Sequence, residues 1–125
     1  ASLQSPKEVY DLLAASMKDL DREHFIALLL DNRHRLLEIE TVSIGSLDAS
    51  IVHPRELFKS CVRRSAAGII IVHNHPSGDS RPSLEDKLVT QRLLEGGKLL
   101  GISILDHVII ASDSFYSMQE HGLLG

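Results

Sequence analysis

The chain has 125 residues, a net charge of −4 and one cysteine, Cys61, which fits one domain whose core needs no disulfide or structural metal. The acidic balance, without a large basic block, argues against broad binding to a nucleic-acid backbone. Because no apolar run approaches the roughly 20 residues that span a bilayer and no signal-peptide pattern begins the chain, we expect a cytoplasmic protein with no membrane partner.

Helical and strand-like patterns alternate along the first half of the chain. Residues 5–8, Ser-Pro-Lys-Glu, have the form of a capping box with proline at the first helical position, and apolar residues then recur at helical spacing. This pattern predicts a helix over about residues 5–20. An apolar run at 25–30, a turn at Asn32-Arg33 and period-two stretches across 35–47 predict a β-hairpin with one central strand.

The second half continues the alternation. Helical spacing over residues 54–67 predicts a helix with Leu57, Cys61 and Val62 facing inward. The elements predicted after it are a buried strand at 68–72, a long helix at 83–100, a strand at 101–110 and a short strand at 114–118. Because strands this apolar need cover on both faces, we predict an α/β fold, a single three-layer domain over residues 1–125 with a mixed sheet flanked by helices.

Two histidines at the end of the 68–72 strand form the main candidate site. His73 and His75 are two residues apart in an extended segment, so both imidazoles point the same way and can reach one ion. A turn-forming stretch follows at 76–82, and Asp86 lies in the first turn of the next helix. Two imidazoles, one carboxylate and a water match the plan of a catalytic zinc site. The sequence therefore predicts Zn²⁺ held by His73, His75 and Asp86.

Each of these residues also has a purely structural interpretation. Ser83 and Asp86 have the form of a helix N-cap with an acidic residue in the first turn, which alone contributes about 1 kcal/mol. Cys61 is most simply a small core residue. Asp79 after Gly78 is most simply part of a turn. Buried or cross-strand hydrogen bonds are the preferred explanation for His53, Asp106 and His107.

The motif around the histidines resembles that of the RadC family, whose domain belongs to the JAMM/MPN+ metalloproteases. Its pattern is an upstream Glu, then His-x-His, seven residues, Ser, two residues and Asp, and His73, His75, Ser83 and Asp86 fit it. Similar segments at 28–31, 53–56 and 105–107 extend the resemblance over nearly the whole chain. The resemblance implies a JAMM zinc domain with a cytidine-deaminase-like α/β fold, isopeptidase-like chemistry in relatives and a DNA-repair label. Full-length RadC proteins carry an N-terminal helix-hairpin-helix segment, which we do not find in this chain.

The resemblance also implies catalytic roles. A zinc ion would lower the pKa of a bound water from about 15.7 toward 7. Glu23, just ahead of the 25–30 run, is the best-placed candidate for the general base that the family pattern requires, and Ser83 would donate a hydrogen bond to the oxyanion. The rival bases are Glu38, Glu40 and Glu56. The expected function is zinc-dependent hydrolysis of a peptide or isopeptide bond in a protein or peptide substrate.

Other classes of function stay open at this stage. A zinc deaminase is set aside, because that chemistry uses His-x-Glu with a distant Pro-Cys-x-x-Cys and this chain has one cysteine. A non-enzymatic module in DNA repair or recombination, with metal merely stabilising the loop, is the main alternative. Direct DNA contact by this domain alone is doubtful, although Arg63 and Arg64 form a small basic patch.

Overall fold

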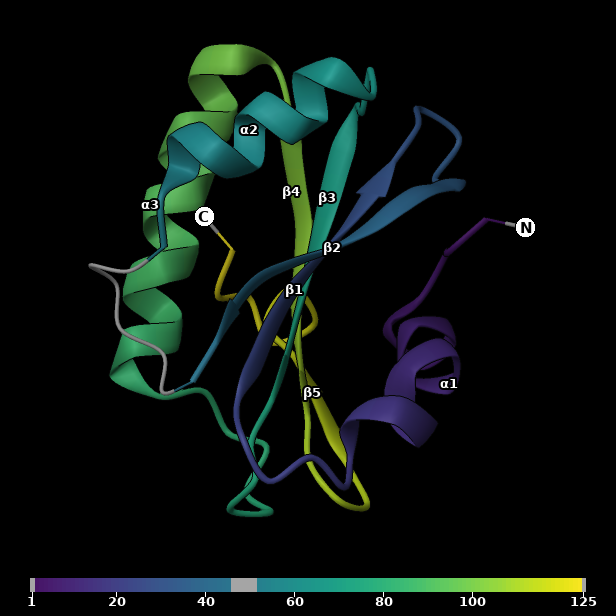
Figure 1. The fold of residues 1–125 in the computed structure, drawn as a ribbon, viewed down its shortest axis with the longest axis vertical. Coiled ribbons are helices and arrows are strands. Elements are labelled where there is room, and N and C mark those ends of the chain that lie inside the picture. The colour runs from purple at the N-terminus through teal and green to yellow at the C-terminus, as the bar shows by residue number, and fades with distance from the viewer. Residues whose placement is uncertain (1, 46–51, 125) are drawn as a thin grey trace.

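The computed structural model describes residues 2–45 and 52–124. Its elements, in chain order, are α1 (Pro6–Met17), β1 (His24–Leu30), β2 (Leu36–Ile44), α2 (Pro54–Arg63), β3 (Gly68–Asn74), α3 (Leu84–Leu100), β4 (Ser103–Ile110) and β5 (Phe115–Ser117). Figure 1 shows α1 on one side of the strands and the pair α2 and α3 on the other. None of the helices in the described ranges is long and apolar enough to cross a membrane.

The five strands form one mixed sheet in the order β2-β1-β3-β4-β5 (Figure 1). β1 is antiparallel to both β2 and β3, β3 is parallel to β4, and β4 is antiparallel to β5. The predicted α/β fold with a mixed sheet between two helical layers is therefore confirmed. The parallel pair needs a crossover, and α3 supplies it between β3 and β4.

Strand alternation divides the core into two clusters. Phe25, Ala27 and Leu29 of β1 face α2 and α3, whereas the intervening Ile26 and Leu28 face α1. β3 is buried along its whole length, from Gly68 to Asn74. A strand that is covered on both faces holds its side chains rigidly. The candidate site is thus built on the most constrained strand of the sheet.

The sequence prediction for α2 was wrong at two points. The helix ends at Arg63 instead of continuing over residues 54–67, because the chain turns at Ser65, which has a positive φ of 54°. Val62 does not face inward and is 66% exposed. A helix rotates about 100° per residue, so the position after the buried Cys61 points away from the core.

Smaller differences concern the ends of other elements. The capping box of α1 is half formed: the Ser5 hydroxyl accepts the Glu8 N–H, but the Glu8 carboxylate accepts the N–H of Gln4. α3 ends at Leu100, and Gly101 caps it with a positive φ of 71°, so β4 begins at Ser103 and not within 101–102. The predicted continuation of the β2 strand to residue 47 lies outside the described residues.

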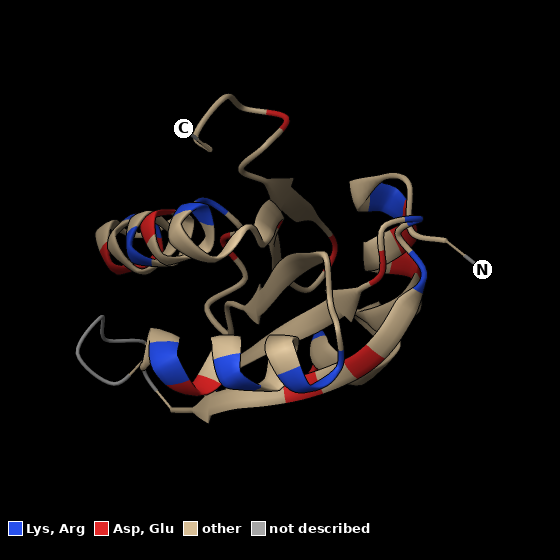
Figure 2. Ribbon diagram, turned by 90° about the horizontal axis from the view of Figure 1, so that it is seen from above, with Lys and Arg blue, Asp and Glu red and all other residues tan. Residues whose placement is uncertain are grey.

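The distribution of charged residues, which matters for contact with nucleic acid, is shown in Figure 2. Both charges occur along α3, whereas α2 carries Arg55, Lys59 and Arg63 with one acidic residue, Glu56. Arg64 is engaged locally, because its guanidinium donates to the carbonyl of Leu37. Arg55, Lys59 and Arg63 are exposed and lie four residues apart, so they form a short basic row along one face of α2.

Cys61 is expected to resist thiol reagents in the folded protein. Its side chain is fully buried, and burial, together with the nearby Glu40 carboxylate, raises the pKa of the thiol from 9.0 to about 11. This lowers the thiolate fraction about 100-fold at neutral pH. Labelling with a disulfide reagent should therefore be at least about 100-fold slower than in denaturant. Cys61→Ser identifies the signal, and equal rates in both states would contradict the buried position.

Candidate metal centre

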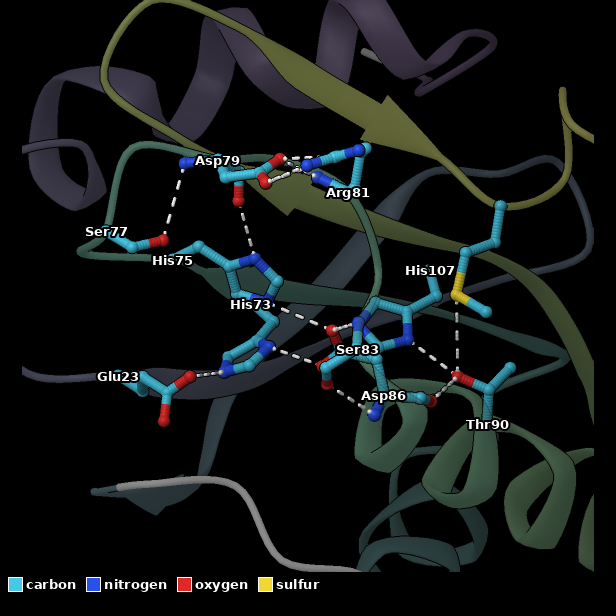
Figure 3. A network of polar contacts seen from close by, with 11 residues as sticks. Glu23, His73, His75, Ser77, Asp79, Arg81, Ser83, Asp86, Thr90 and His107 are labelled. Carbon is cyan, nitrogen blue, oxygen red and sulfur yellow. Dashed lines mark hydrogen bonds and ion pairs between the residues drawn. The ribbon is translucent and has the colours of Figure 1, made fainter.

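The site lies where β1 begins, β3 ends and α3 begins. His73 is the penultimate residue of β3 and is 1% exposed, and His75 follows directly after the strand. The chain then turns through residues 76–82 and enters α3 with Ser83 as the N-cap. Figure 3 shows the two imidazoles and the Asp86 carboxylate facing one another, as the i, i+2 spacing predicts.

Asp86 connects both imidazoles to the start of α3. Its Oδ1 lies 2.9 Å from Nδ1 of His73, and its Oδ2 lies 3.0 Å from Nε2 of His75 (Figure 3). The same carboxylate accepts the Ser83 N–H at 2.7 Å, while the Ser83 hydroxyl accepts the Asp86 N–H at 3.0 Å. Ser83 and Asp86 therefore do form the helix cap of the structural interpretation. The cap and the contact with the histidines are compatible, because the cap holds the carboxylate in place.

Glu23 is the one candidate base that the structure brings to the histidines. It immediately precedes β1, and the pairing of Phe25 with His73 places it beside the end of β3. Its Oε1 lies 3.5 Å from Nε2 of His73.

The rival glutamates have contacts elsewhere. Glu40 accepts a hydrogen bond from Ser60, and Glu38 lies 3.6 Å from the Arg64 guanidinium. Glu56, on α2, lines a separate hollow together with Glu40.

Burial and hydrogen bonds set the charges in the site. Burial would raise the pKa of Asp86, but the hydrogen bonds from His73 and His75 hold that pKa well below its usual range. Burial would lower the pKa of His75, but Asp86 and the carbonyl of Asp79 raise it. Asp86 is therefore a carboxylate in the folded protein, with an imidazole of increased proton affinity beside it.

The donor atoms suit a divalent metal ion. Ligand atoms of Glu23, His73 and His75 all lie within 4.8 Å of one another. Nδ1 of His73 donates to Asp86, so Nε2 carries the lone pair, and this buried atom has no hydrogen-bond partner within the described residues. Imidazole nitrogens with carboxylate oxygens are a typical zinc donor set. Asp86, the predicted third ligand, contacts His73 from the opposite side of the ring.

A second group of donors lies deeper in the protein. Ligand atoms of His73, Asp86 and His107 also lie within 4.8 Å of one another, and all three residues are buried. The Thr90 hydroxyl donates to the carbonyl of Asp86, so Nδ1 of His107, 2.6 Å from that hydroxyl, carries the proton of their shared bond. Nε2 of His107 then holds a lone pair, and it too lacks a hydrogen-bond partner in the part of the chain that the structure describes.

Burial keeps His107 neutral. Burial in the core, with His73 and His75 adding to its effect, lowers the pKa of His107 to about 3, and the negative charge of Asp86 opposes the shift. The sequence analysis treated His107 as structural and did not single out Thr90. Thr90 is four residues after Asp86, a spacing that places both on one face of α3 and was the available signal.

An open hollow of about 690 Å³ borders the site. Glu23, His75 and Ser83 line it, together with Gly45 at the end of β2. On its rim the Asp79 carboxylate is 2.8 Å from the Arg81 guanidinium, and Arg81 lowers the pKa of Asp79 to about 2. The remaining lining residues are Asp21, Arg22, Pro76 and Ser77.

The comparison with known protein families agrees with this geometry. The model of the RadC-like JAB domain matches residues 3–123. The chain belongs to this family. The resemblance to RadC inferred from the histidine motif is thereby confirmed, and the α/β fold is consistent with it.

The relatives that resemble this chain are named UPF0758 proteins. A UPF0758 protein of Desulforamulus reducens is 52% identical over 122 residues, which are 98% of this chain and 54% of the relative. A UPF0758 protein of Methanosarcina mazei is 54% identical over 122 residues, which are 98% of this chain and 53% of the relative. A UPF0758 protein of Caldanaerobacter subterraneus is 53% identical over 121 residues, 97% of this chain and 52% of its own. The chain thus spans about half the length of the curated relatives that it matches.

Proposed function

We propose that this RadC-like domain is a cytoplasmic zinc-dependent hydrolase that cleaves peptide or isopeptide bonds. The observation that carries the proposal is the convergence of Glu23, His73 and His75 beside an open hollow, from segments about fifty residues apart in the chain. A buried imidazole nitrogen with a lone pair, a second imidazole and a partly exposed carboxylate are a combination suited to metal-assisted hydrolysis.

The ligands that we propose are His73, His75 and Asp86, the set that the motif predicts, although the donor atoms that the structure already brings together beside the hollow are those of Glu23, His73 and His75. A zinc ion in this site supplies a Lewis acid and a nucleophilic water at neutral pH. His75 is oriented for this role, because its Nδ1 donates to the carbonyl of Asp79 at 2.8 Å and its Nε2 faces the other site residues. Such a hydrogen bond sets the tautomer of a ligating imidazole. Asp86 is oriented by the N–H of Ser83.

Glu23 and Ser83 would carry out the proton transfer and the charge stabilisation. The Glu23 side chain is 26% exposed at the edge of the hollow, so its carboxylate can take a proton from water and pass it to the leaving amine. The Ser83 oxygen accepts the Asp86 N–H, and its own O–H can donate to an oxyanion without breaking that bond. Both residues line the same hollow.

The substrate that fits this hollow best is an extended peptide segment. β2 is an edge strand of the sheet, and Gly45, directly after it, lines the hollow. A peptide that pairs with such an edge uses main-chain hydrogen bonds and needs no basic patch. We therefore propose a protein or peptide substrate.

The first test is the zinc content of the purified protein, measured by elemental analysis on the native chain, His75→Ala and Glu23→Ala. We expect near-stoichiometric zinc in the native chain and in Glu23→Ala, and loss of zinc in His75→Ala. Hydrolysis of peptide and isopeptide substrates is then screened on the zinc-loaded protein. Absence of metal after zinc is supplied would overturn the proposal, and loss of zinc in Glu23→Ala would make Glu23 a ligand and not the base.

The buried donors around His107 support one alternative. An ion held by His73, Asp86 and His107 would be enclosed in the core, without an exchangeable water, and would stabilise the domain without catalysis. This arrangement fits a non-enzymatic module in DNA repair or recombination. His107→Ala separates the two proposals: zinc lost in His107→Ala and kept in His75→Ala favours the buried ion, and the reverse pattern favours the hydrolase.

A further inference from the structure

Asn74, between the two histidines, lies on the opposite face of β3 from them. It is the last residue of the strand, and it is 2% exposed. Because successive side chains of a strand alternate, Asn74 points away from the candidate metal centre. A buried amide needs hydrogen-bond partners, and those partners explain its position.

The Asn74 side chain binds the backbone on both sides of Glu23. Its amide oxygen accepts the N–H of His24 at 2.6 Å, and its NH₂ group donates to the carbonyl of Arg22 at 2.9 Å. A backbone N–H only donates and a carbonyl only accepts, so this pair of contacts determines which way the amide points. The two contacts bridge 50 and 52 residues of sequence.

These bonds continue the sheet past the point where its backbone pairing stops. The pairing of β1 with β3 runs from Leu30 with Gly68 to Phe25 with His73, and Glu23 lies beyond this end. On the other side, the N–H of Gly45 donates to the Glu23 carbonyl at 2.8 Å. Glu23 is therefore held by Asn74 through both neighbours and by Gly45 directly.

We propose that Asn74 is a positioning residue that holds Glu23 toward His73 and the hollow. The proposal rests on the proposed role of Glu23 in hydrolysis. The motif thus contributes to two parts of the site: its histidines face the metal centre, and the residue between them anchors the base. An amide suits this role because it offers a donor and an acceptor at once, whereas Asp in its place would set a second acceptor against the Arg22 carbonyl.

The test compares Asn74→Ala, which removes both bonds, with Asn74→Asp, which keeps an acceptor for His24. Amide hydrogen exchange measured by NMR reports how firmly the backbone next to Glu23 is fixed, and it needs no substrate. We expect exchange at the His24 and Gly45 amides to rise about tenfold in Asn74→Ala, the effect of losing one buried hydrogen bond, with zinc content unchanged. Ser117→Ala, which removes a buried hydrogen bond to Asp106 away from the site, is the control for general destabilisation.

Activity provides the second readout. Because a misplacement of about 1 Å can cost about 100-fold in rate, we expect kcat to fall about 10- to 100-fold in Asn74→Asp with little change in KM. In a Glu23→Gln background the same substitution should cost less than about threefold, since its effect passes through Glu23. An equal loss in both backgrounds, or unchanged exchange at both amides, would overturn the proposal. A zinc-loaded native protein without hydrolysis would refute the proposed function. The exchange rates of the His24 and Gly45 amides would still show whether Asn74 holds the backbone around Glu23 in place.

Discussion

Replacement of Asp86 by alanine is expected to abolish zinc binding and to lower the free energy of unfolding of the metal-free protein by about 3 kcal/mol. The carboxylate is fully buried and contacts His73, His75 and the N–H of Ser83. Alanine leaves the imidazole N–H of His73 and the backbone N–H of Ser83 without their acceptor in the core, and it removes the contact with Nε2 of His75. It also removes the proposed third ligand and half of the capping box of α3.

Two variants separate these contributions. Ser83→Ala removes only the hydroxyl side of the cap, so it should cost about 1 kcal/mol and leave zinc content unchanged. Asp86→Asn keeps an oxygen acceptor of the same size, so it should unfold at a higher denaturant concentration than Asp86→Ala and still lack zinc. Denaturant unfolding and elemental analysis measure both effects. Stoichiometric zinc in Asp86→Ala would remove Asp86 from the proposed ligand set.

Replacement of Glu23 by glutamine should lower kcat by about 10²- to 10⁴-fold, the usual contribution of a general base. Glutamine has nearly the same shape, so the loss follows from its inability to accept a proton. Zinc content should stay unchanged, because Glu23 is proposed to act on the water and not on the ion. The measurement is steady-state hydrolysis of a peptide or isopeptide substrate by the zinc-loaded protein.

Glu38→Gln is the matched control. Glu38 was a rival candidate in the sequence, but its carboxylate lies near Arg64 on the β2 side of the sheet. This substitution should change kcat less than about threefold. If Glu38→Gln lost activity while Glu23→Gln kept it, the assignment of the base would be wrong.

The strands, the helices and the fold class were predictable because each depends on neighbouring residues. The apolar run at 68–72, for example, has the composition of a buried strand, and it lies within β3. The error at Val62 has the same local origin. Helical spacing alone does not show which residues at the border of the apolar face are buried. In the folded protein α2 packs through Leu57, Phe58 and Cys61 instead.

The local sequence was enough to predict how His73, His75, Ser83 and Asp86 are arranged. These residues lie within fourteen positions of one another, in a strand, a turn and a helix start whose local geometry directs their side chains. The motif spacing was therefore sufficient to propose a metal centre.

Packing of segments distant in the chain brings Glu23 to the histidines, sets the Asn74 side chain against the backbone on both sides of Glu23, and places His107 near His73. Glu23 reaches His73 because β1 pairs with β3 in a register that sets Phe25 opposite His73. That register follows from burying both faces of β1 at once, since a shift by one residue would exchange the side chains that face α1 with those that face α2 and α3. Contacts over fifty residues depend on such packing, and no local pattern in the chain specifies them.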